Sequence, residues 1–110
     1  MYNSFYIMES EINEVIFMYI TITGSDMFMG MEAFKVGQTL ILKKDIDSPY
    51  DDESIKVISE TGASLGFVAN SVDSVARGTH SAGYIYNSFK DSTNCKVLFI
   101  TYDKVIAEVE

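Results

Sequence analysis

Apolar and polar residues alternate along most of the chain, in short runs that are separated by turn-forming residues. The earliest long run, Val15–Thr23, is rich in β-branched and aromatic residues, which predicts a strand with much of both faces covered. Further strands are predicted at Gly37–Lys44, Ser54–Ser59, Ser64–Val68, Cys95–Tyr102 and Val105–Val109. Because the strands are short and little helix separates them, the pattern predicts a mainly β protein. We expect a small barrel or sandwich of about six strands with one or two short helices.

Two glycines mark places where the pattern predicts an irregular backbone. Gly62 lies in a tight hairpin connection, where a residue with positive φ is expected. Gly66 lies inside the returning strand, where it indicates either a β-bulge or a close approach of another backbone.

Helical segments are predicted between the fourth and fifth strands. Asn70 is expected to cap a short helix over Ser71–Arg77. Asp73 then holds the capping-box position, and Gly78 ends the helix. A second helical turn is expected to lead to Phe89 before the fifth strand begins.

Length and composition indicate one domain with a small core. The 110 residues are 47% hydrophobic and 13% aromatic, so disorder is not expected. Residues 1–110 are expected to form a single domain, in which 15–109 form the barrel and 1–14 an N-terminal extension or edge strand. Exposed first and last strands would leave free edges for pairing with another chain.

The charge balance is strongly acidic, with sixteen acidic and eight basic residues and a formal net charge of −8. A field of this sign repels nucleic acid at long range, so any nucleic-acid site has to be local. Cys95, the only cysteine, lies in an apolar strand, which favours a reducing, cytoplasmic location and a buried, inert thiol. No signal peptide is recognised, and the longest apolar run, Val15–Ile22, is too short to span a membrane.

A polar turn with the only proline of the chain joins the second and third strands. Pro49 has a restricted φ and pushes Ser48 toward an extended conformation, so the turn is stiff. Tyr50 and Asp51 follow directly, and an aromatic face beside a carboxylate can stack on a flat ring and accept a hydrogen bond from a hydroxyl. Because Asp, Ser and Pro are also common in purely structural turns, these residues alone leave open whether the turn binds a ligand.

Motifs of enzymatic, metal and cofactor chemistry are absent from the sequence. The chain lacks a P-loop, a Gly-x-Gly-x-x-Gly fingerprint, a nucleophile elbow and a His-Glu-x-x-His pattern. His80, the only histidine, is interpreted as a loop residue, and the acidic turn lacks the glycine and spacing of a calcium loop. We therefore expect no catalytic residues, no cofactor and no metal. The methionines at period two are interpreted as gap-filling core residues: Met27, Met29 and Met31.

Several segments together resemble the HIRAN domain, over roughly residues 16–102, as the strand-and-turn order of a small barrel requires. The most specific is similar to the Asn-Pro-Tyr-Asp-x-Asn-Ala-Ile-x-Val of that family and stands here as Ser48-Pro49-Tyr50-Asp51-Asp52-Glu53-Ser54-Ile55-Lys56-Val57. A further segment is similar to one in small stand-alone bacterial members, namely Ser81-Ala82-Gly83-Tyr84-Ile85-Tyr86. The resemblance implies a small β-barrel related to OB and SH3 folds.

The resemblance also implies a module that recognises the 3′-hydroxyl end of single-stranded DNA, in DNA repair or processing. In DNA-remodelling ATPases of the family, the tyrosine and aspartate of the turn help to hold the terminal nucleotide, and they match Tyr50 and Asp51. Where DNA-binding relatives carry an arginine followed by aromatics, this chain has Asp26, Met27 and Phe28. The implied DNA site is therefore Tyr50, Asp51 and Phe28, with weak binding because an acid replaces the phosphate-facing cation.

Three classes of function stay open on the sequence. The first is this DNA-end module, with a helicase or nuclease as a partner protein, since the chain carries no such module itself. The alternative is an acidic protein-interaction barrel that has lost DNA binding and meets a basic partner. The third, an enzyme built on Tyr50, Asp51 and His80, is not expected, and it requires a fold that brings these residues together.

Overall fold

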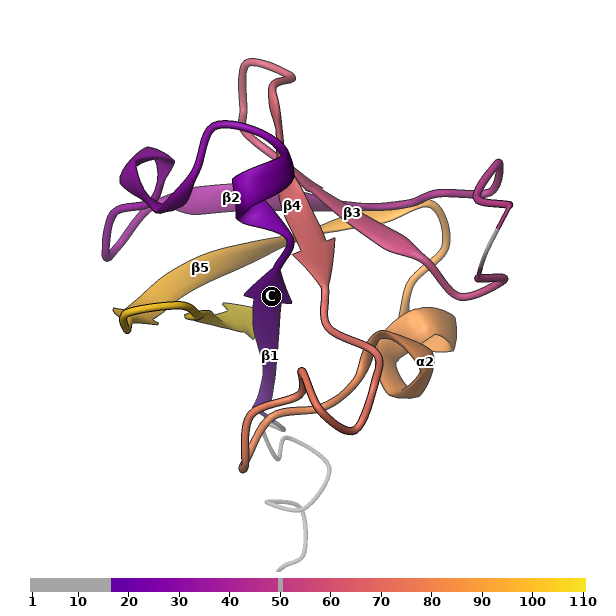
Figure 1. Ribbon diagram of the computed structural model, residues 1–110. Coiled ribbons are helices and arrows are strands. Elements are labelled where there is room, and N and C mark those ends of the chain that lie inside the picture. Colours follow the sequence, from indigo (N-terminus) through magenta and orange to yellow (C-terminus); the bar gives the residue numbers. More distant parts are fainter. Residues whose placement is uncertain (1–16, 50) are drawn as a thin grey trace, which may run out of the picture.

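The computed structural model describes residues 17–49 and 51–110. In this part of the chain, six strands form a closed antiparallel barrel in the order β1-β4-β3-β2-β5-β6 (Figure 1). The strands are β1 (Met18–Thr23), β2 (Thr39–Lys44), β3 (Ile55–Ile58), β4 (Ser64–Val68), β5 (Ser92–Ile100) and β6 (Val105–Val109). The predicted small, mainly β barrel is confirmed, whereas the extension or edge strand predicted within residues 1–14 lies outside the described residues.

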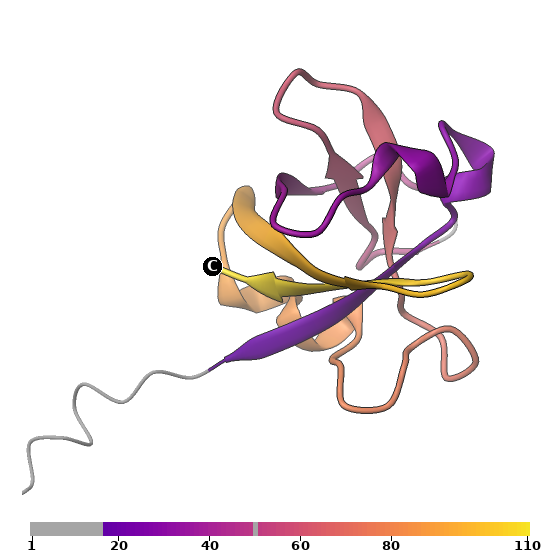
Figure 2. The ribbon, with the colours of Figure 1, turned by 90° about the vertical axis from the view of Figure 1, so that its left-hand side faces the viewer.

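Strand β1 closes the barrel, because it pairs with β4 on one side and with β6 on the other. Ile22 of β1 stands opposite Val68 of β4 and opposite Val105 of β6. Figure 2 shows β1 running alongside β6, which also pairs with β5. The prediction of free edges on the first and last strands is therefore wrong for β1 and β6, because closure of the barrel gives each of them two neighbouring strands.

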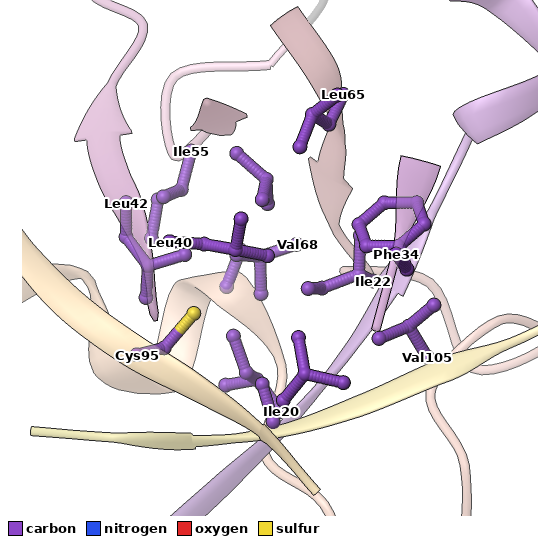
Figure 3. Close-up of a cluster of buried hydrophobic side chains, with 14 of the residues drawn as sticks. Ile20, Ile22, Phe34, Leu40, Leu42, Ile55, Leu65, Val68, Cys95 and Val105 are labelled. Carbon is purple, nitrogen blue, oxygen red and sulfur yellow. The ribbon is translucent and has the colours of Figure 1, made fainter. Parts of the chain in front are cut away.

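Alternate side chains of the strands point into the barrel and form its core (Figure 3). The buried hydrophobic residues are Ile20, Ile22, Phe34, Leu40, Leu42, Ile55, Val57, Leu65, Val68, Ala69, Ala82, Ile85, Cys95, Val97, Val105 and Ala107. Burying one large aliphatic side chain contributes ~1.5–3 kcal/mol to folding. The period-two pattern that predicted the strands is therefore also what stabilises the barrel.

The sulfur of Cys95 points into this core, as predicted for a buried thiol (Figure 3). Burial, and to a smaller extent the negative charge of Glu110, raises the pKa of the Cys95 thiol to about 12. The thiol stays protonated at neutral pH, which makes it a poor nucleophile.

Gly66 satisfies both of the alternatives that were predicted for it. The register between β3 and β4 shifts directly after the pair of Val57 and Gly66, which marks a bulge. A Cβ atom on residue 66 would lie 2.6 Å from the carbonyl oxygen of Thr23, so only glycine allows β4 and β1 to approach this closely. Gly62 has a φ of +96°, as predicted for the hairpin turn.

The helix predicted over Ser71–Arg77 is wrong, since this segment consists of turns. The hydroxyl groups of Ser71 and Ser74 are hydrogen-bonded to each other at 2.8 Å, and Ser74 Oγ lies 3.2 Å from the Ser71 carbonyl oxygen. Such local hydrogen bonds compete with a helical ladder. Val72 is 94% exposed, so the segment also lacks the packed apolar face that stabilises most short helices.

The second predicted helical turn is confirmed as α2, Ala82–Ile85, which continues as a 3-10 turn over Tyr86–Ser88. Two of its apolar side chains are buried in the core. In both ribbon views, α2 lies well apart from the two 3-10 turns that follow β1, at Ser25–Met27 and Met31–Ala33 (Figures 1 and 2). The turns and α2 therefore approach the barrel from different sides.

Candidate nucleic-acid interface

The turn between β2 and β3 is held at its base by backbone hydrogen bonds. The N–H group of Asp45 donates to the carbonyl oxygen of Ser54 at 2.8 Å, and the N–H group of Ser48 donates to the carbonyl oxygen of Asp45 at 3.2 Å. Lys44 and Ile55 form the last register pair before the turn. These bonds satisfy the backbone groups that the strands leave unpaired, and they hold the start of the turn in one conformation.

Asp51 links this turn to the segment that contains Asn70. Its Oδ1 accepts a hydrogen bond from the N–H group of Glu53 at 2.8 Å, and its Oδ2 accepts one from Nδ2 of Asn70 at 2.9 Å. Oδ1 of Asn70 accepts in turn from the N–H group of Gly83 at 2.8 Å. Asp51 therefore has a structural role, and it retains acceptor capacity because an ionised carboxylate offers about four lone-pair positions.

Asn70 joins the turn to α2, so the prediction that it caps a helix is wrong. Its two amide atoms are used in bonds to segments that lie far from it in sequence. Gly83 packs closely at this junction, since a Cβ atom there would lie 2.5 Å from Oε1 of Glu53 and 3.3 Å from Oδ1 of Asn70. A local sequence motif cannot reveal such a bridge, because its partners meet only in the folded chain.

A cleft of about 390 Å³ opens beside Asp51, and we call it the turn cleft. Residues of the first 3-10 turn, the β2–β3 turn and β4 line it: Met27, Asp45, Ser48, Pro49, Asp51, Ser54, Phe67 and Val68. The cleft combines the apolar surfaces of Met27 and Phe67 with the carboxylates of Asp45 and Asp51. An aromatic face next to a carboxylate can hold a flat ring and accept a hydrogen bond from a hydroxyl group.

Phe67 is the aromatic wall of the turn cleft, and it was not among the site residues predicted from the sequence. Phe28, which the resemblance does assign to the site, packs beside it with ring centroids 5.7 Å apart and planes tilted by 50°. Phe28 is 40% exposed and adjoins the cleft through Phe67, without being among the lining residues. The signal that could have identified Phe67 is an aromatic residue directly after Gly66, at a half-exposed position of a strand.

Two of the three methionines after β1 are exposed, which corrects their interpretation as core residues. Met27 is 70% and Met29 63% exposed, whereas Met31 packs against the core. The period-two pattern separates inner from outer positions in a strand, but these residues lie in and between 3-10 turns, where it does not apply. Met27 lines the turn cleft, and its flexible, polarisable side chain suits a binding surface.

Lysine side chains lie next to the turn cleft, in a groove of about 370 Å³ that we call the lysine groove. Its lining residues are Lys43, Lys44, Asp45, Ile46, Asp47, Lys56 and Asp91, so it shares Asp45 with the turn cleft. Lys43 and Lys56 stand directly opposite each other on β2 and β3. Like charges in this position destabilise a sheet, and Nζ of Lys56 lies 3.9 Å from Oδ1 of Asp45. An anion beside Lys43 would reduce the remaining repulsion.

Tyr50, the predicted stacking residue, lies outside the described residues. Its neighbours on both sides, Pro49 and Asp51, line the turn cleft. Asp26, which the resemblance matches to a cation of DNA-binding HIRAN domains, is exposed in the 3-10 turn next to Met27. Two of the predicted site residues, Asp51 and Phe28, are thus brought to one region of the surface, with Phe67 between the Phe28 ring and the cleft.

His80 does not line the turn cleft. Its N–H group donates to the carbonyl oxygen of Tyr19 at 2.7 Å, and its ring stacks on the ring of Tyr84. Among residues 17–49 and 51–110, no group of three His, Cys, Asp or Glu side chains could hold a metal ion. The same part of the chain contains no helix whose length and apolar character would let it cross a membrane.

Comparisons with known proteins identify the fold. No protein-family model matches the chain, and no curated protein matches it. Among solved structures, the chain is similar to a crystal structure of a protein from Lactobacillus plantarum, determined by the Northeast structural genomics consortium. The match has a TM-score of 0.54 at 15% sequence identity, and it covers 86% of this chain and 97% of that protein. At this identity, the similarity shows a shared fold.

Proposed function

We propose that this protein is a HIRAN-like module that binds the 3′-hydroxyl end of single-stranded DNA in the turn cleft, in DNA repair or processing. The observation that carries the proposal is the lining of the turn cleft. It brings Asp51 of the motif together with the aromatic ring of Phe67 and the side chain of Met27. These residues come from three separate segments, so their meeting follows from the fold and not from proximity in sequence.

The turn cleft suits a nucleotide that ends in a free hydroxyl group. The base would stack on Phe67, and stacking of this kind tolerates every base and is worth ~1–3 kcal/mol. The 3′-hydroxyl would donate a hydrogen bond to Asp51, whose oxygens retain acceptor positions. A 3′-phosphate would bring negative charge next to Asp45 and Asp51, so charge repulsion would favour the hydroxyl end.

The lysine groove would supply positive charge for the phosphates of the strand. Lys43 and Lys56 lie next to the turn cleft, while the chain as a whole carries a net charge of −8. Three aspartates, Asp45, Asp47 and Asp91, line the same groove as its three lysines and weaken its attraction for phosphate. We therefore expect weak binding that falls steeply as the salt concentration rises.

Fluorescence anisotropy at low salt tests the proposal with three oligonucleotides: a strand with a 3′-hydroxyl, the same strand with a 3′-phosphate, and a blunt duplex. We expect the 3′-hydroxyl strand to bind more tightly than the other two. Asp51→Ala should remove the preference for hydroxyl over phosphate. Asp103→Ala removes a carboxylate that is 65% exposed and lies away from the turn cleft, so the preference should persist.

A second variant separates the role of Asp51 in binding from its role in the fold. Asp51→Ala leaves Nδ2 of Asn70 without its acceptor, so circular dichroism has to establish that the variant folds. Asp51→Asn keeps the shape and one acceptor oxygen, so it retains one of the two hydrogen bonds of Asp51 and should disturb the fold less than Asp51→Ala does. Because it removes the charge that repels a 3′-phosphate, it should reduce the preference. A preference that survives in both folded variants, or a wild-type protein that binds no strand end, contradicts the proposal.

The alternative is an acidic protein-interaction barrel that has lost DNA binding, and a different, apolar surface supports it. An apolar groove of about 460 Å³, which we call the side groove, lies against β1, β5 and β6. It is lined by Tyr19, Ala76, Arg77, Gly78, Thr79, Leu98, Phe99, Thr101, Lys104 and Ile106, and Phe99 is 62% exposed. Exposed apolar patches often mark contact surfaces. This alternative predicts no binding to any oligonucleotide and a protein partner retained in a pull-down. A helicase or nuclease partner and a cytoplasmic location stay predictions.

A further inference from the structure

A second cleft lies next to the hydrogen bond between Asp51 and Asn70. It has a volume of about 440 Å³, and we call it the stack cleft. Its lining residues are Asn70, Ser71, Val72, Val75, Thr79, His80, Ser81 and Tyr84. Asn70 lines this cleft, and its Nδ2 donates to Asp51, which lines the turn cleft. One pair of hydrogen-bonded side chains therefore connects the two clefts.

Two stacked aromatic rings belong to the stack cleft. The ring centroids of His80 and Tyr84 are 4.1 Å apart, and the ring planes differ by 9°. The N–H group of His80 donates to the carbonyl oxygen of Tyr19, and the N–H group of Tyr84 donates to Oγ of Ser81, so both backbones are anchored. Tyr84 is 65% exposed, which leaves much of its ring accessible to a further ring. The pair forms a platform of the kind that single-stranded nucleic acids use for stacking.

The stack cleft differs in lining from the rest of this acidic chain, whose formal net charge is −8. The described lining residues include no carboxylate, no ammonium and no guanidinium group. Polar groups of Asn70 and Ser71 lie there together with Val72, which is 94% exposed. A cleft without carboxylate, ammonium or guanidinium groups, with an aromatic platform and polar edges, suits a planar ring with hydrogen-bonding groups, and a nucleobase has this chemistry.

Close packing holds the two clefts in a defined relation. The N–H group of Gly83 donates to Oδ1 of Asn70, and a Cβ atom on residue 83 would lie 2.5 Å from Oε1 of Glu53. Tyr84 follows Gly83 directly in α2. Direct contacts therefore lead from Asp51 through Asn70 and Gly83 to the residue that carries the exposed ring.

We propose that the stack cleft is a second nucleobase site, which holds the base next to the 3′-terminal nucleotide by stacking on Tyr84. The inference rests on the proposed function, since it takes the terminal nucleotide to occupy the turn cleft. Holding two successive unpaired bases favours single strands over duplex, because bases of a duplex have to unstack and unpair before they can enter such sites.

An abasic position in the oligonucleotide tests the inference directly. In fluorescence anisotropy, a 3′-hydroxyl strand whose second nucleotide from the 3′ end lacks a base should bind the wild-type protein at least about five-fold more weakly than the intact strand. Tyr84→Ala should show a similar loss with the intact strand and no further loss with the abasic strand, since both changes remove the same stack.

Two control variants separate stacking from general surface effects. Tyr84→Phe retains the ring and should bind the intact strand like the wild-type protein. Tyr102→Ala removes a tyrosine that is 98% exposed and lines neither the turn cleft nor the stack cleft, and it should also bind like the wild-type protein. A loss of affinity in Tyr102→Ala as large as that in Tyr84→Ala would overturn the assignment of the second base to the stack cleft.

The readouts distinguish failure of this inference from failure of the proposed function. Tyr84→Ala should keep the preference for a 3′-hydroxyl over a 3′-phosphate, because that preference depends on Asp51. The stack cleft is not the second base site if the abasic strand binds as well as the intact one. The same conclusion follows if the losses of affinity from Tyr84→Ala and from the abasic position add. In both cases a preference for the 3′-hydroxyl still supports the terminal site in the turn cleft. If no single strand binds, both proposals are overturned.

Discussion

The turn cleft and the side groove are similar in size, about 390 and 460 Å³, and each has an aromatic wall, but their charged residues differ in sign. Asp45 and Asp51 line the turn cleft, whereas Arg77 and Lys104 line the side groove. On charge alone, a polyanion would favour the side groove. The function proposed above instead places in the turn cleft an end of a DNA strand that carries no terminal phosphate, the 3′-hydroxyl end. Local chemistry therefore points to a different surface from the one that a simple charge argument favours.

The two surfaces also differ in how firmly their charged groups are held. Asp51 accepts one hydrogen bond from the N–H group of Glu53 in its own turn and one from Asn70 in a distant segment of the chain. Lys104 pairs at 3.4 Å with Asp103, its neighbour in sequence, and such exposed pairs contribute little. A carboxylate that is already oriented loses less conformational entropy on binding, which favours the turn cleft as the more specific site.

The largest expected effect comes from removing the aromatic wall of each surface. Phe67→Ala should weaken binding of a 3′-hydroxyl strand by about 5- to 150-fold, which corresponds to ~1–3 kcal/mol for one stacked base. Phe99→Ala makes the same truncation in the side groove and should leave the affinity unchanged. Anisotropy titrations of both folded variants measure the difference. The opposite order of effects would assign DNA binding to the side groove.

A second effect, on the stability of the fold and not on affinity, is expected from the glycines around the turn cleft. Gly66→Ala should lower the free energy of unfolding by ~1–3 kcal/mol, because the new Cβ atom would overlap the Thr23 carbonyl oxygen and force β4 and β1 apart. Gly83→Ala should cost less, since its Cβ atom would meet the flexible end of the Glu53 side chain. Urea unfolding followed by tyrosine fluorescence measures both values. Equal costs would show that the β4 backbone beside Phe67 yields more easily than its close contact with β1 indicates.

The smallest expected effect concerns the salt dependence of DNA binding. Lys43→Ala should reduce the slope of log affinity against log salt concentration by about 1, because one phosphate contact in the lysine groove is lost. Lys104→Ala removes a cation from the side groove and should leave the slope unchanged. Anisotropy titrations over a series of salt concentrations provide both slopes. A changed slope in Lys104→Ala alone would place the path of the strand over the side groove.

The strands could be predicted from the sequence because their information is local. Alternation of apolar residues such as Leu40 and Leu42 indicates which side of a strand is buried, and it was correct in β2 and β3, whereas β1 buries three successive residues. The alternation of apolar residues could not show where a polar strand begins. The fifth strand was predicted to begin at Cys95, yet Ser92 to Asn94 also belong to β5, because pairing with β2 satisfies their backbone groups whatever their side chains are.

Part of the candidate site could also be predicted from the sequence, since the Pro-Tyr-Asp turn indicated Asp51. Phe67 and Asn70 were missed, and a helix was wrongly predicted after Asn70. In each case the deciding contact joins residues that are distant in the chain, such as Asp51 and Asn70. Local propensities contain no term for such contacts.

The amino-acid sequence thus determined the class of fold, the short strands and the stiff acidic turn, because each depends on neighbours within a few residues. Closure of the barrel decided which strands have free edges and which residues meet in the turn cleft. By pairing β1 with both β4 and β6, it removed the edges predicted for the first and last strands. The same folding brought Phe67, Met27 and Asp51 to one cleft, since surfaces of this kind form only when segments far apart in sequence pack around one core.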